Sequence, residues 1–302
     1  MKALITGING FTGRYLATEL SQAGYKVYGV AHRPVEAIID GMKSVYICDL
    51  ENINELTHVI EEVQPDVIVH LAAIAFVAHG DIETIYRTNL IGSRNLLEAI
   101  LCSGETPTSV LLASSANIYG NSSEGMLDEI TSPAPANDYA VSKLAMEYMA
   151  RLYMDRLPII IVRPFNYTGV GQSESFLLPK IVNHVRRRAP VVELGNLDVA
   201  RDFSDVRNVV QFYRYLLSTP TAIGETFNVC SGQAYTLRDV LQMIREISGH
   251  NFEVRVNPAF IRSNEVKILL GSRAKLDAVL MERAPQIPLR ETLRWMLEEG
   301  DR

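Results

Sequence analysis

The first thirteen residues, MKALITGINGFTG, constrain the fold more than any other stretch of the chain. The apolar run at residues 3–6 is typical of a strand buried on both faces of a parallel sheet. Glycines follow at Gly7, Gly10 and Gly13, and residues 14–23 are typical of a helix. A glycine turn between strand and helix lets the backbone approach a pyrophosphate, which the helix N-terminus attracts through free N–H groups. The spacing is GxxGxxG rather than the commoner GxGxxG, but its place between strand and helix favours nucleotide binding over a plain turn.

Strands and helices alternate through the first half of the chain. We predict strands at 3–6, 26–31, 44–47, 67–71, 109–113 and 159–163, and helices at 14–23, 53–63, 82–103 and 139–153. This alternation predicts an α/β fold, a doubly wound parallel sheet with helices on both faces. After residue 163 the pattern loosens, and isolated strands at 191–194, 226–229 and 252–256 suggest a smaller α/β lobe. We expect a nucleotide-binding domain over residues 1–165, rejoined by residues 199–222, and a lobe formed mainly by residues 166–302.

Composition excludes several classes of function. The 302 residues are 47% hydrophobic and 21% charged, with a net charge of −6, which argues against a nucleic-acid-binding protein. No apolar run is long enough to span a bilayer, and the N-terminus enters a strand directly, without a signal peptide. The cysteines, Cys48, Cys102 and Cys230, are widely spaced and show neither a metal pattern nor a disulfide framework. We expect a cytoplasmic protein without a bound metal, and we expect Cys48 and Cys102 to be buried.

The end of the second predicted strand bears on the choice of cofactor. An acidic residue there binds the 2′-hydroxyl of NAD, whereas an arginine accommodates the 2′-phosphate of NADP. The sequence has His32 and Arg33 at this place and no acid, so NADP(H) is favoured and NAD(H) remains possible. Asp49 and Leu50, after the third strand, could contact the adenine, although a loop-capping role for Asp49 fits almost as well. The small residues of Leu71–Ala73, after the fourth strand, let a ribose or nicotinamide approach the backbone, whereas we expect His70 to be structural.

A possible chemical site lies in the sequence DYAVSK. Tyr139 and Lys143 are four residues apart on a predicted helix and therefore share a face. A lysine ammonium beside a phenol is expected to lower the phenol's pKa, which makes the tyrosine a usable acid or base. Such pairs also occur by chance. The hydroxyl-rich loop at residues 114–120 strengthens the chemical interpretation of the pair. It follows a strand of the sheet, and its serine could bind an oxygen on which charge develops.

Together these motifs resemble the extended short-chain dehydrogenases/reductases that act on nucleotide sugars, over essentially the whole chain. The matching elements are the GxxGxxG turn, the HLAA strand end, the serine loop, the Tyr139/Lys143 pair and the RPFN sequence at 163–166. The resemblance implies a Rossmann-like fold in which Tyr139 is the catalytic acid/base, Lys143 binds the nicotinamide ribose, and Ser115 binds the reacting oxygen. It also implies that Asn166 contacts the sugar or its diphosphate. The cofactor-binding residues it implies are Gly7, Gly10, Phe11, Thr12, Gly13, Arg33, Asp49, Leu50, Leu71, Ala72, Ala73, Tyr139 and Lys143.

The C-terminal half is similar to the GDP-mannose branch of this family, which includes GDP-mannose 4,6-dehydratase and GDP-4-keto-6-deoxymannose reductase. The similar segments are RPFNYTGVGQ at 163–172, GNLDVARDFSDVRNVV at 195–210 and IRSNEVKILLGSRAKL at 261–276. The resemblance implies that Arg201, Arg262 and Glu265 help to hold the GDP diphosphate and ribose. Arginines are suited to phosphate because they donate two parallel hydrogen bonds, although each could instead form a surface ion pair.

The residues after Ser115 favour one reaction of this branch. Dehydratases of the family carry an additional carboxylate beside the serine or threonine, whereas this chain has Ala116 and Asn117, which argues against a dehydratase. Reduction of the C4 ketone of GDP-4-dehydro-6-deoxy-D-mannose, to GDP-D-rhamnose or GDP-6-deoxy-talose, needs only Ser115, Tyr139 and Lys143. A nucleotide-sugar 4-epimerase with retained NAD, or a 4-ketoreductase for a dTDP, CDP or UDP sugar, remains an alternative. Apolar residues on several faces of helices 82–103 and 139–153 suggest a homodimer through a four-helix bundle, as in the family.

Overall fold

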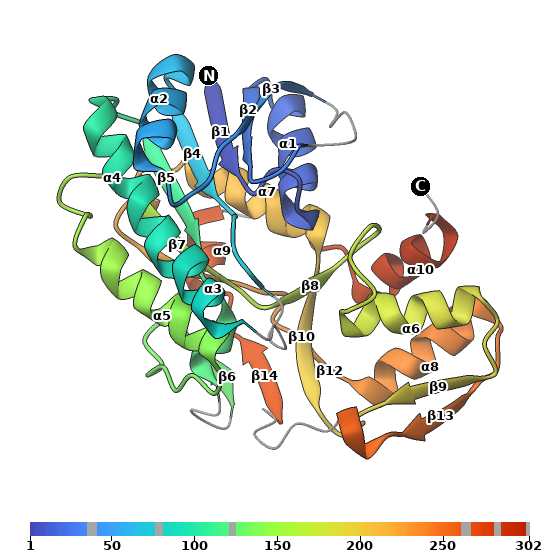
Figure 1. Cartoon of the computed structure of the whole chain (residues 1–302). Coiled ribbons are helices and arrows are strands. Elements are labelled where there is room, and N and C mark those ends of the chain that lie inside the picture. Colours follow the sequence, from blue (N-terminus) through green and yellow to red (C-terminus); the bar gives the residue numbers. More distant parts are fainter. Residues whose placement is uncertain (35–40, 76–80, 121–124, 261–266, 281–284, 300–302) are drawn as a thin grey trace.

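Seven parallel strands form the main sheet, in the order β11-β7-β5-β4-β1-β2-β3 (Figure 1). The structure is a computed structural model that describes residues 1–34, 41–75, 81–120, 125–260, 267–280 and 285–299. The order confirms the expected doubly wound sheet, because the strands progress in opposite directions from β1 and β4, the point where such sheets bind ligands. The strands are β1 (Lys2–Thr6), β2 (Lys26–Ala31), β3 (Met42–Ile47), β4 (Val67–His70), β5 (Ser109–Ala113), β7 (Ile159–Pro164) and β11 (Thr226–Val229).

Helices cover both faces of this sheet. On one face lie α1 (Phe11–Gln22), α7 (Val206–Leu217) and α9 (Ala274–Leu280), and on the other lie α2 (Ile53–Val63), α4 (Ser93–Ser103) and α5 (Asp138–Arg151). Strand β1 supplies both cores: Ala3 and Ile5 face the first set of helices and Leu4 faces the second, because side chains alternate along a strand. The continuous apolar runs of the sequence are therefore explained by burial on both faces.

A second sheet connects the main sheet to a smaller lobe. Its path is β12-β10-β14-β6, and β8 pairs with the far end of β10. In Figure 1, β8 and β10 run between the main sheet and a lobe in which α6, α8 and α10 lie over β9 and β13. The bounds are β6 (Met126–Leu127), β8 (Asn166–Thr168), β9 (Val191–Leu194), β10 (Ala200–Asp205), β12 (Ala234–Thr236), β13 (Glu253–Val256), β14 (Ile268–Gly271), α6 (Leu177–Arg186), α8 (Leu237–Ser248) and α10 (Leu289–Glu299).

Three expectations need correction. Strand β11, which we placed in the smaller lobe, is the edge strand of the main sheet beside β7. The expected single helix 82–103 consists of α3 (Ile82–Tyr86), a wider π-helical turn η1 (Arg87–Gly92) and α4. Cys48 is buried as expected, but Cys102 is exposed, because it lies on the solvent side of the last turn of α4. Three short 3₁₀ turns complete the described elements: η2 (Ala116–Tyr119), η3 (Pro220–Ala222) and η4 (Pro258–Phe260).

Candidate active site

The glycine turn after β1 brings α1 very close to the ends of β1 and β4. Gly7 has a φ of +70°, and a Cβ at this position would lie 2.7 Å from the backbone nitrogen of Ala72. A Cβ on Gly13 would collide with the carbonyl oxygen of Gly7. Gly10 precedes α1 and has no side chain to cap the helix, so the first N–H groups of α1 are available to an anion. The turn has the shape of a pyrophosphate cradle, which no larger residue at these positions could form.

His70 is confirmed as a structural residue at the end of β4. Its Nδ1 lies 2.7 Å from the Thr6 hydroxyl, and its Nε2 lies 2.9 Å from the Ser93 hydroxyl. Because the Ser93 hydroxyl donates its hydrogen to the Asn89 carbonyl at 2.7 Å, it must accept the hydrogen bond from His70 Nε2–H, which assigns the tautomer of the neutral ring. Burial, with a smaller contribution from the charge of Lys143, lowers the pKa of His70 to about 3. His70 is therefore a fixed, neutral link between two strands and a helix.

Asn89, in the π-helical turn, extends this network toward the chemical site. Its side-chain amide exchanges two hydrogen bonds with the backbone of Ile74, at 2.9 and 3.2 Å. The same amide donates to the Ser142 hydroxyl at 3.0 Å, and that hydroxyl donates to the Tyr139 carbonyl at 2.8 Å. A wider turn is a common device for directing a side chain inward. Sequence reasoning missed Asn89, which joins the loop after β4 to the helix of Tyr139.

Ser115, Tyr139 and Lys143 meet at the carboxyl end of β5. Asn137 caps α5 by accepting a hydrogen bond from the Ala140 N–H, so Tyr139 lies in the first turn of the helix and Lys143 one turn later. The Lys143 Nζ donates to the Ala113 carbonyl at 2.8 Å, which places it against the last residue of β5. A side-chain hydrogen bond links Ser115 to Tyr139. The three residues that the sequence singled out are therefore in one place, and all three are buried.

The expected pKa of Tyr139 was wrong in direction. Burial raises it to about 12, although the hydrogen bond with Ser115 lowers it. Burial also lowers the pKa of Lys143 to about 8, against the opposing charge of Glu147. The sequence showed the spacing of the two groups but not their burial, which is the larger effect. At neutral pH the phenol is protonated, and the site contains a proton donor.

A buried ion pair joins α5 to the main sheet. Glu147 follows Lys143 by one further turn, and both its carboxylate oxygens bind Arg163, at 2.9 and 2.7 Å. The Arg163 guanidinium also donates to the Tyr119 hydroxyl at 2.9 Å, and that hydroxyl donates to the Asn228 side chain at 2.7 Å. The network ties α5 to β7, to η2 and to β11. Arg163 opens the RPFN motif, and its role in the fold is to hold the helix of the chemical residues.

The residues expected near the adenosine lie at the ends of β2 and β3. Arg33 is exposed and is the second residue after the end of β2. The neighbouring His32 lies 3.6 Å from the Asp49 carboxylate, which also accepts the Glu51 N–H at 2.9 Å. Asp49 therefore shapes its own loop, the alternative that the sequence left open. The Leu50 carbonyl is held by Asn95 at 2.9 Å.

The residues expected to bind substrate are not brought together as closely as Ser115, Tyr139 and Lys143. Asn166 begins β8 and pairs with Phe203 of β10, while Arg201 lies two residues earlier on β10. The Arg201 guanidinium donates to the carbonyls of Ala200 and Lys267, at 2.9 and 3.2 Å. Arg262 and Glu265 lie outside the described residues.

The whole chain is similar to proteins of nucleotide-sugar metabolism. The family model described as GDP-mannose 4,6 dehydratase matches residues 4–296. A GDP-6-deoxy-D-talose 4-dehydrogenase of Aggregatibacter actinomycetemcomitans is 36% identical over 93% of this chain and 91% of its own length. A GDP-6-deoxy-D-mannose reductase of Pseudomonas aeruginosa is 32% identical over 99% of this chain and 97% of its own length.

Two solved structures share the fold over nearly the full length. A protein from Burkholderia cenocepacia, provisionally described as an epimerase, has a TM-score of 0.93 and 52% identity, and the match covers 98% of this chain and 97% of that one. The structure of RMD from Pseudomonas aeruginosa, complexed with NADPH, has a TM-score of 0.85 and 30% identity, with coverage of 99% and 98%.

Proposed function

This chain belongs to the GDP-mannose 4,6-dehydratase family, and on that premise we propose that it is an NADPH-dependent reductase of a 4-keto nucleotide sugar. One observation carries the proposal. Tyr139, Ser115 and Lys143 form a complete reduction site, whereas the two residues after Ser115 are Ala116 and Asn117 rather than a carboxylate. Asn117 instead donates to the Ser115 hydroxyl from its backbone and its side chain, both at 3.1 Å. Elimination across C5 and C6 of a sugar needs a base at this place, and reduction does not.

In this reaction the side chains bind and protonate a developing alkoxide. When bound, the nicotinamide cofactor supplies the hydride. Tyr139, protonated at neutral pH, donates its proton to the C4 oxygen, and Ser115 stabilises that oxygen by a hydrogen bond. Lys143, fixed by the Ala113 carbonyl, places its positive charge near the end of β5, where it favours the phenolate left after proton transfer.

The cofactor assignment is supported by the shape and charge of the dinucleotide side of the sheet. The Gly7–Gly13 turn fits a pyrophosphate, since added Cβ atoms would collide with Ala72 and with the turn itself. Arg33 follows β2 where NAD-binding proteins carry an acid, so we assign the 2′-phosphate of NADPH to Arg33. The similarity to a structure complexed with NADPH supports the same choice.

The substrate assignment is GDP-4-dehydro-6-deoxy-D-mannose, reduced to GDP-D-rhamnose or to its C4 epimer GDP-6-deoxy-talose. It is supported by two relatives whose names specify GDP-linked 6-deoxy sugars. We assign the sugar or diphosphate to Asn166, on β8, and the GDP diphosphate and ribose to Arg201, Arg262 and Glu265. The face that the sugar turns toward the cofactor decides which of the two products forms.

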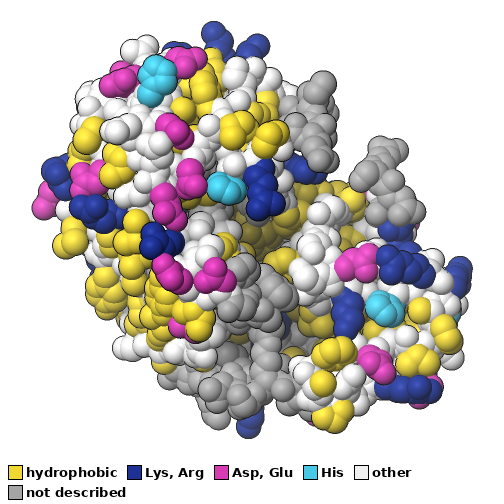
Figure 2. All heavy atoms as spheres, viewed as in Figure 1, with side chains coloured by type: hydrophobic (Ala, Val, Ile, Leu, Met, Phe, Trp, Pro, Cys, Tyr) yellow, Lys and Arg dark blue, Asp and Glu magenta, His cyan; other side chains and the backbone are white. Residues whose placement is uncertain are grey.

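The proposal includes a homodimer built from α3, η1 and α5. Val141 and Tyr148 are exposed on α5 and Leu152 is exposed directly after it, while Ile82 and Ile91 are exposed on the neighbouring helical turns. Figure 2 shows hydrophobic side chains gathered on the side of the molecule where these helices lie in Figure 1. We expect Leu152→Glu to convert the dimer to a monomer in sedimentation at micromolar concentration. A wild-type protein that sediments as a monomer contradicts this assembly.

The proposal also places the enzyme in the cytoplasm, where its free cysteines, two of them buried, stay reduced. None of the helices in the described residues could cross a membrane. Recovery of the native protein in a cytoplasmic fraction would support this location, and recovery in a secreted fraction would contradict it.

The deciding experiment measures NADPH consumption with GDP-4-keto-6-deoxymannose and determines the C4 configuration of the product by NMR. Consumption of one NADPH for each molecule of reduced sugar formed supports the reductase. The C4 configuration then identifies the product. Interconversion of unreduced nucleotide sugars without net NADPH consumption would instead identify a 4-epimerase; the Burkholderia protein is described as an epimerase, without a stated substrate. Parallel assays with the dTDP, CDP and UDP analogues of the substrate test which nucleotide the enzyme accepts.

A further inference from the structure

A short segment, residues 166–170, runs from the main sheet into the second sheet beside the glycine turn. It follows β7 and Phe165, and its first part, β8, pairs with β10. The segment carries Asn166, the candidate substrate residue, and it lies against the first turn of α1, which carries candidate cofactor residues. It is therefore placed to set the distance between the two binding sites.

Tyr167 makes the contact with α1. Its Oη lies 2.8 Å from the Thr12 hydroxyl, and its ring stacks on Phe11 with the centroids 6.2 Å apart and the planes 12° apart. Phe11 and Thr12 are the first two residues of α1. The sequence analysis did not identify Tyr167, because its partner is 155 residues away in the chain.

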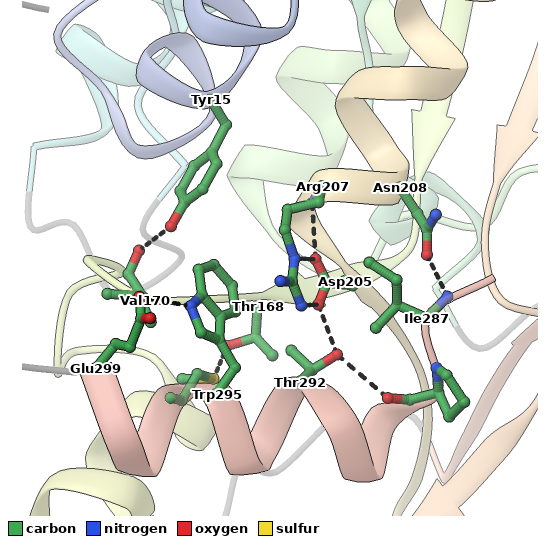
Figure 3. A network of polar contacts seen from close by, with 12 residues as sticks. Tyr15, Thr168, Val170, Asp205, Arg207, Asn208, Ile287, Thr292, Trp295 and Glu299 are labelled. Atoms are coloured by element: carbon green, nitrogen blue, oxygen red, sulfur yellow. Dashed lines mark hydrogen bonds and ion pairs between the residues drawn. The ribbon is translucent and has the colours of Figure 1, made fainter. Parts of the chain in front are cut away.

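Tyr15 holds the far end of the same segment. Its hydroxyl donates to the Val170 carbonyl at 2.7 Å, and its ring meets the edge of Trp295 of α10, with centroids 6.0 Å apart (Figure 3). Gly169, between the two contacts, is tightly enclosed: a Cβ there would lie 2.6 Å from Val206 Cγ1 and 3.0 Å from Trp295 Cζ3. The segment is thus fixed from both sides.

The support on the α10 side is itself anchored. The Thr292 hydroxyl donates to the buried Asp205 carboxylate at 2.7 Å, and Arg207 pairs with the same carboxylate at 2.7 Å (Figure 3). The Arg207 guanidinium lies 3.9 Å from the centre of the Trp295 ring. Since Asp205 caps α7, the helix that packs on the main sheet, α10 is tied to the core of the larger domain.

The Tyr167–Thr12 contact is a neutral hydrogen bond. Burial raises the pKa of Tyr167, and the hydrogen bond with Thr12 lowers it only in part. The phenol therefore keeps its proton over the pH range in which the enzyme works. Its contribution is geometric rather than electrostatic, so removal of the hydroxyl alone should loosen the geometry without changing local charge.

We propose that Tyr167 is a positioning residue: through the Thr12 hydroxyl it holds β8, and with it Asn166, at a fixed distance from the glycine turn. The inference rests on the proposed function, in which these two places bind the nucleotide sugar and the cofactor. Hydride transfer needs the two reacting carbons in near contact, and a misplacement of about 1 Å costs roughly 10²-fold in rate. A hydrogen bond between the elements that carry the two ligands is a direct way to set that distance.

The test compares Tyr167→Phe, which keeps the stacked ring, with Thr12→Val and with the double variant. We expect Tyr167→Phe to lower kcat about fivefold to tenfold and to leave each KM within about twofold. The double variant should be no slower than Thr12→Val alone, because both changes break one bond. Tyr153→Phe is the matched control: it removes a hydroxyl bond to Glu98, 2.6 Å long, away from the site, and kcat should not change.

A binding measurement separates this inference from the proposed function. The Kd of NADPH is measured by calorimetry with and without saturating GDP, and the ratio of the two values reports the coupling of the sites. We expect a ratio of about threefold or more in the wild type that falls toward one in Tyr167→Phe. A wild-type ratio of one, an unchanged ratio in the variant, or independent effects in the double variant overturn the inference. A wild-type protein that binds neither ligand contradicts the proposed function itself, and the coupling with it.

Discussion

The chemical side of the candidate site and the side proposed to bind substrate are built in different ways. Tyr139, Lys143 and Glu147 lie four residues apart on α5, all buried. Asn166 and Arg201 lie on two strands of the second sheet, and neither is fully buried. The chemical side depends on the spacing within one helix, and the substrate side depends on how distant segments pack.

This difference explains how one fold can serve several substrates. The network from Thr6 through His70 and Asn89, together with the Arg163 ion pair, fixes α5 from two directions. None of the residues that make those contacts lies on β8 or β10, the strands that carry Asn166 and Arg201. Reaction type and substrate choice are therefore separable in this architecture, and the predictions below test each side in turn.

Replacement of Tyr139 should have the largest effect. Tyr139→Phe removes the proton donor but keeps the ring, so kcat should fall by about 10²- to 10⁴-fold. The Kd of NADPH, measured by fluorescence titration, should stay nearly unchanged, because the cradle is formed by the glycine turn. A variant that retains wild-type turnover would remove Tyr139 from the mechanism.

The buried ion pair should dominate stability on the chemical side. Arg163→Met leaves the Glu147 carboxylate buried without its partner, which should cost about 3–5 kcal/mol in urea unfolding. The paired variant Glu147→Met with Arg163→Met should recover most of that loss, since it removes both charges of this ion pair. Equal losses in the single and the double variant would show that packing, rather than charge, is what Arg163 contributes.

His70 should make the larger domain sensitive to acid. The unfolded chain protonates His70 near pH 6.5, whereas the folded chain does so only near pH 3, so the unfolded state binds more protons between these values. His70 should therefore remove about 1.4 kcal/mol of stability for each unit by which the pH falls from about 6 to 3. When the free energy of unfolding is measured from pH 7 to pH 4, His70→Asn should lack the part of its pH dependence that His70 contributes. Parallel curves for wild type and variant would contradict a neutral buried His70.

Arg33 should give the smallest effect and affect only the choice of cofactor. Arg33→Ala removes one charged contact to the 2′-phosphate, so the KM of NADPH should rise about tenfold while that of NADH stays the same. The comparison is made in one assay with both cofactors. An equal change for the two would place the 2′-phosphate elsewhere.

The parts of the molecule that could be predicted from sequence are those set by local pattern. The strands β1, β2, β4, β5 and β7 were predicted within about two residues, because runs of apolar residues report burial on both faces. The helical spacing of Tyr139 and Lys143 placed both on one face of α5. The Asn166 strand, by contrast, is defined by its pairing with residues 203–205, which no local pattern reveals.

The features that could not be predicted from the sequence depend on burial and on contacts between residues far apart in the chain. Tyr139 was expected to have a lowered pKa, because the spacing showed its lysine neighbour but not the apolar surroundings that raise it. Tyr167 and Thr12 are 155 residues apart, and β11 joins the main sheet by pairing with β7. Each of these features is decided by tertiary packing rather than by the residues themselves.

The most direct test of the central claim is the fate of a labelled hydride. NADPH carrying deuterium at both C4 positions of the nicotinamide is incubated with GDP-4-keto-6-deoxymannose and the enzyme, and the product is analysed by NMR and mass spectrometry. We predict one deuterium per product molecule, located at C4 of the sugar, and at least about a hundredfold less product with Tyr139→Phe. A product without deuterium, or with deuterium at another carbon, would contradict reduction at C4 by this site.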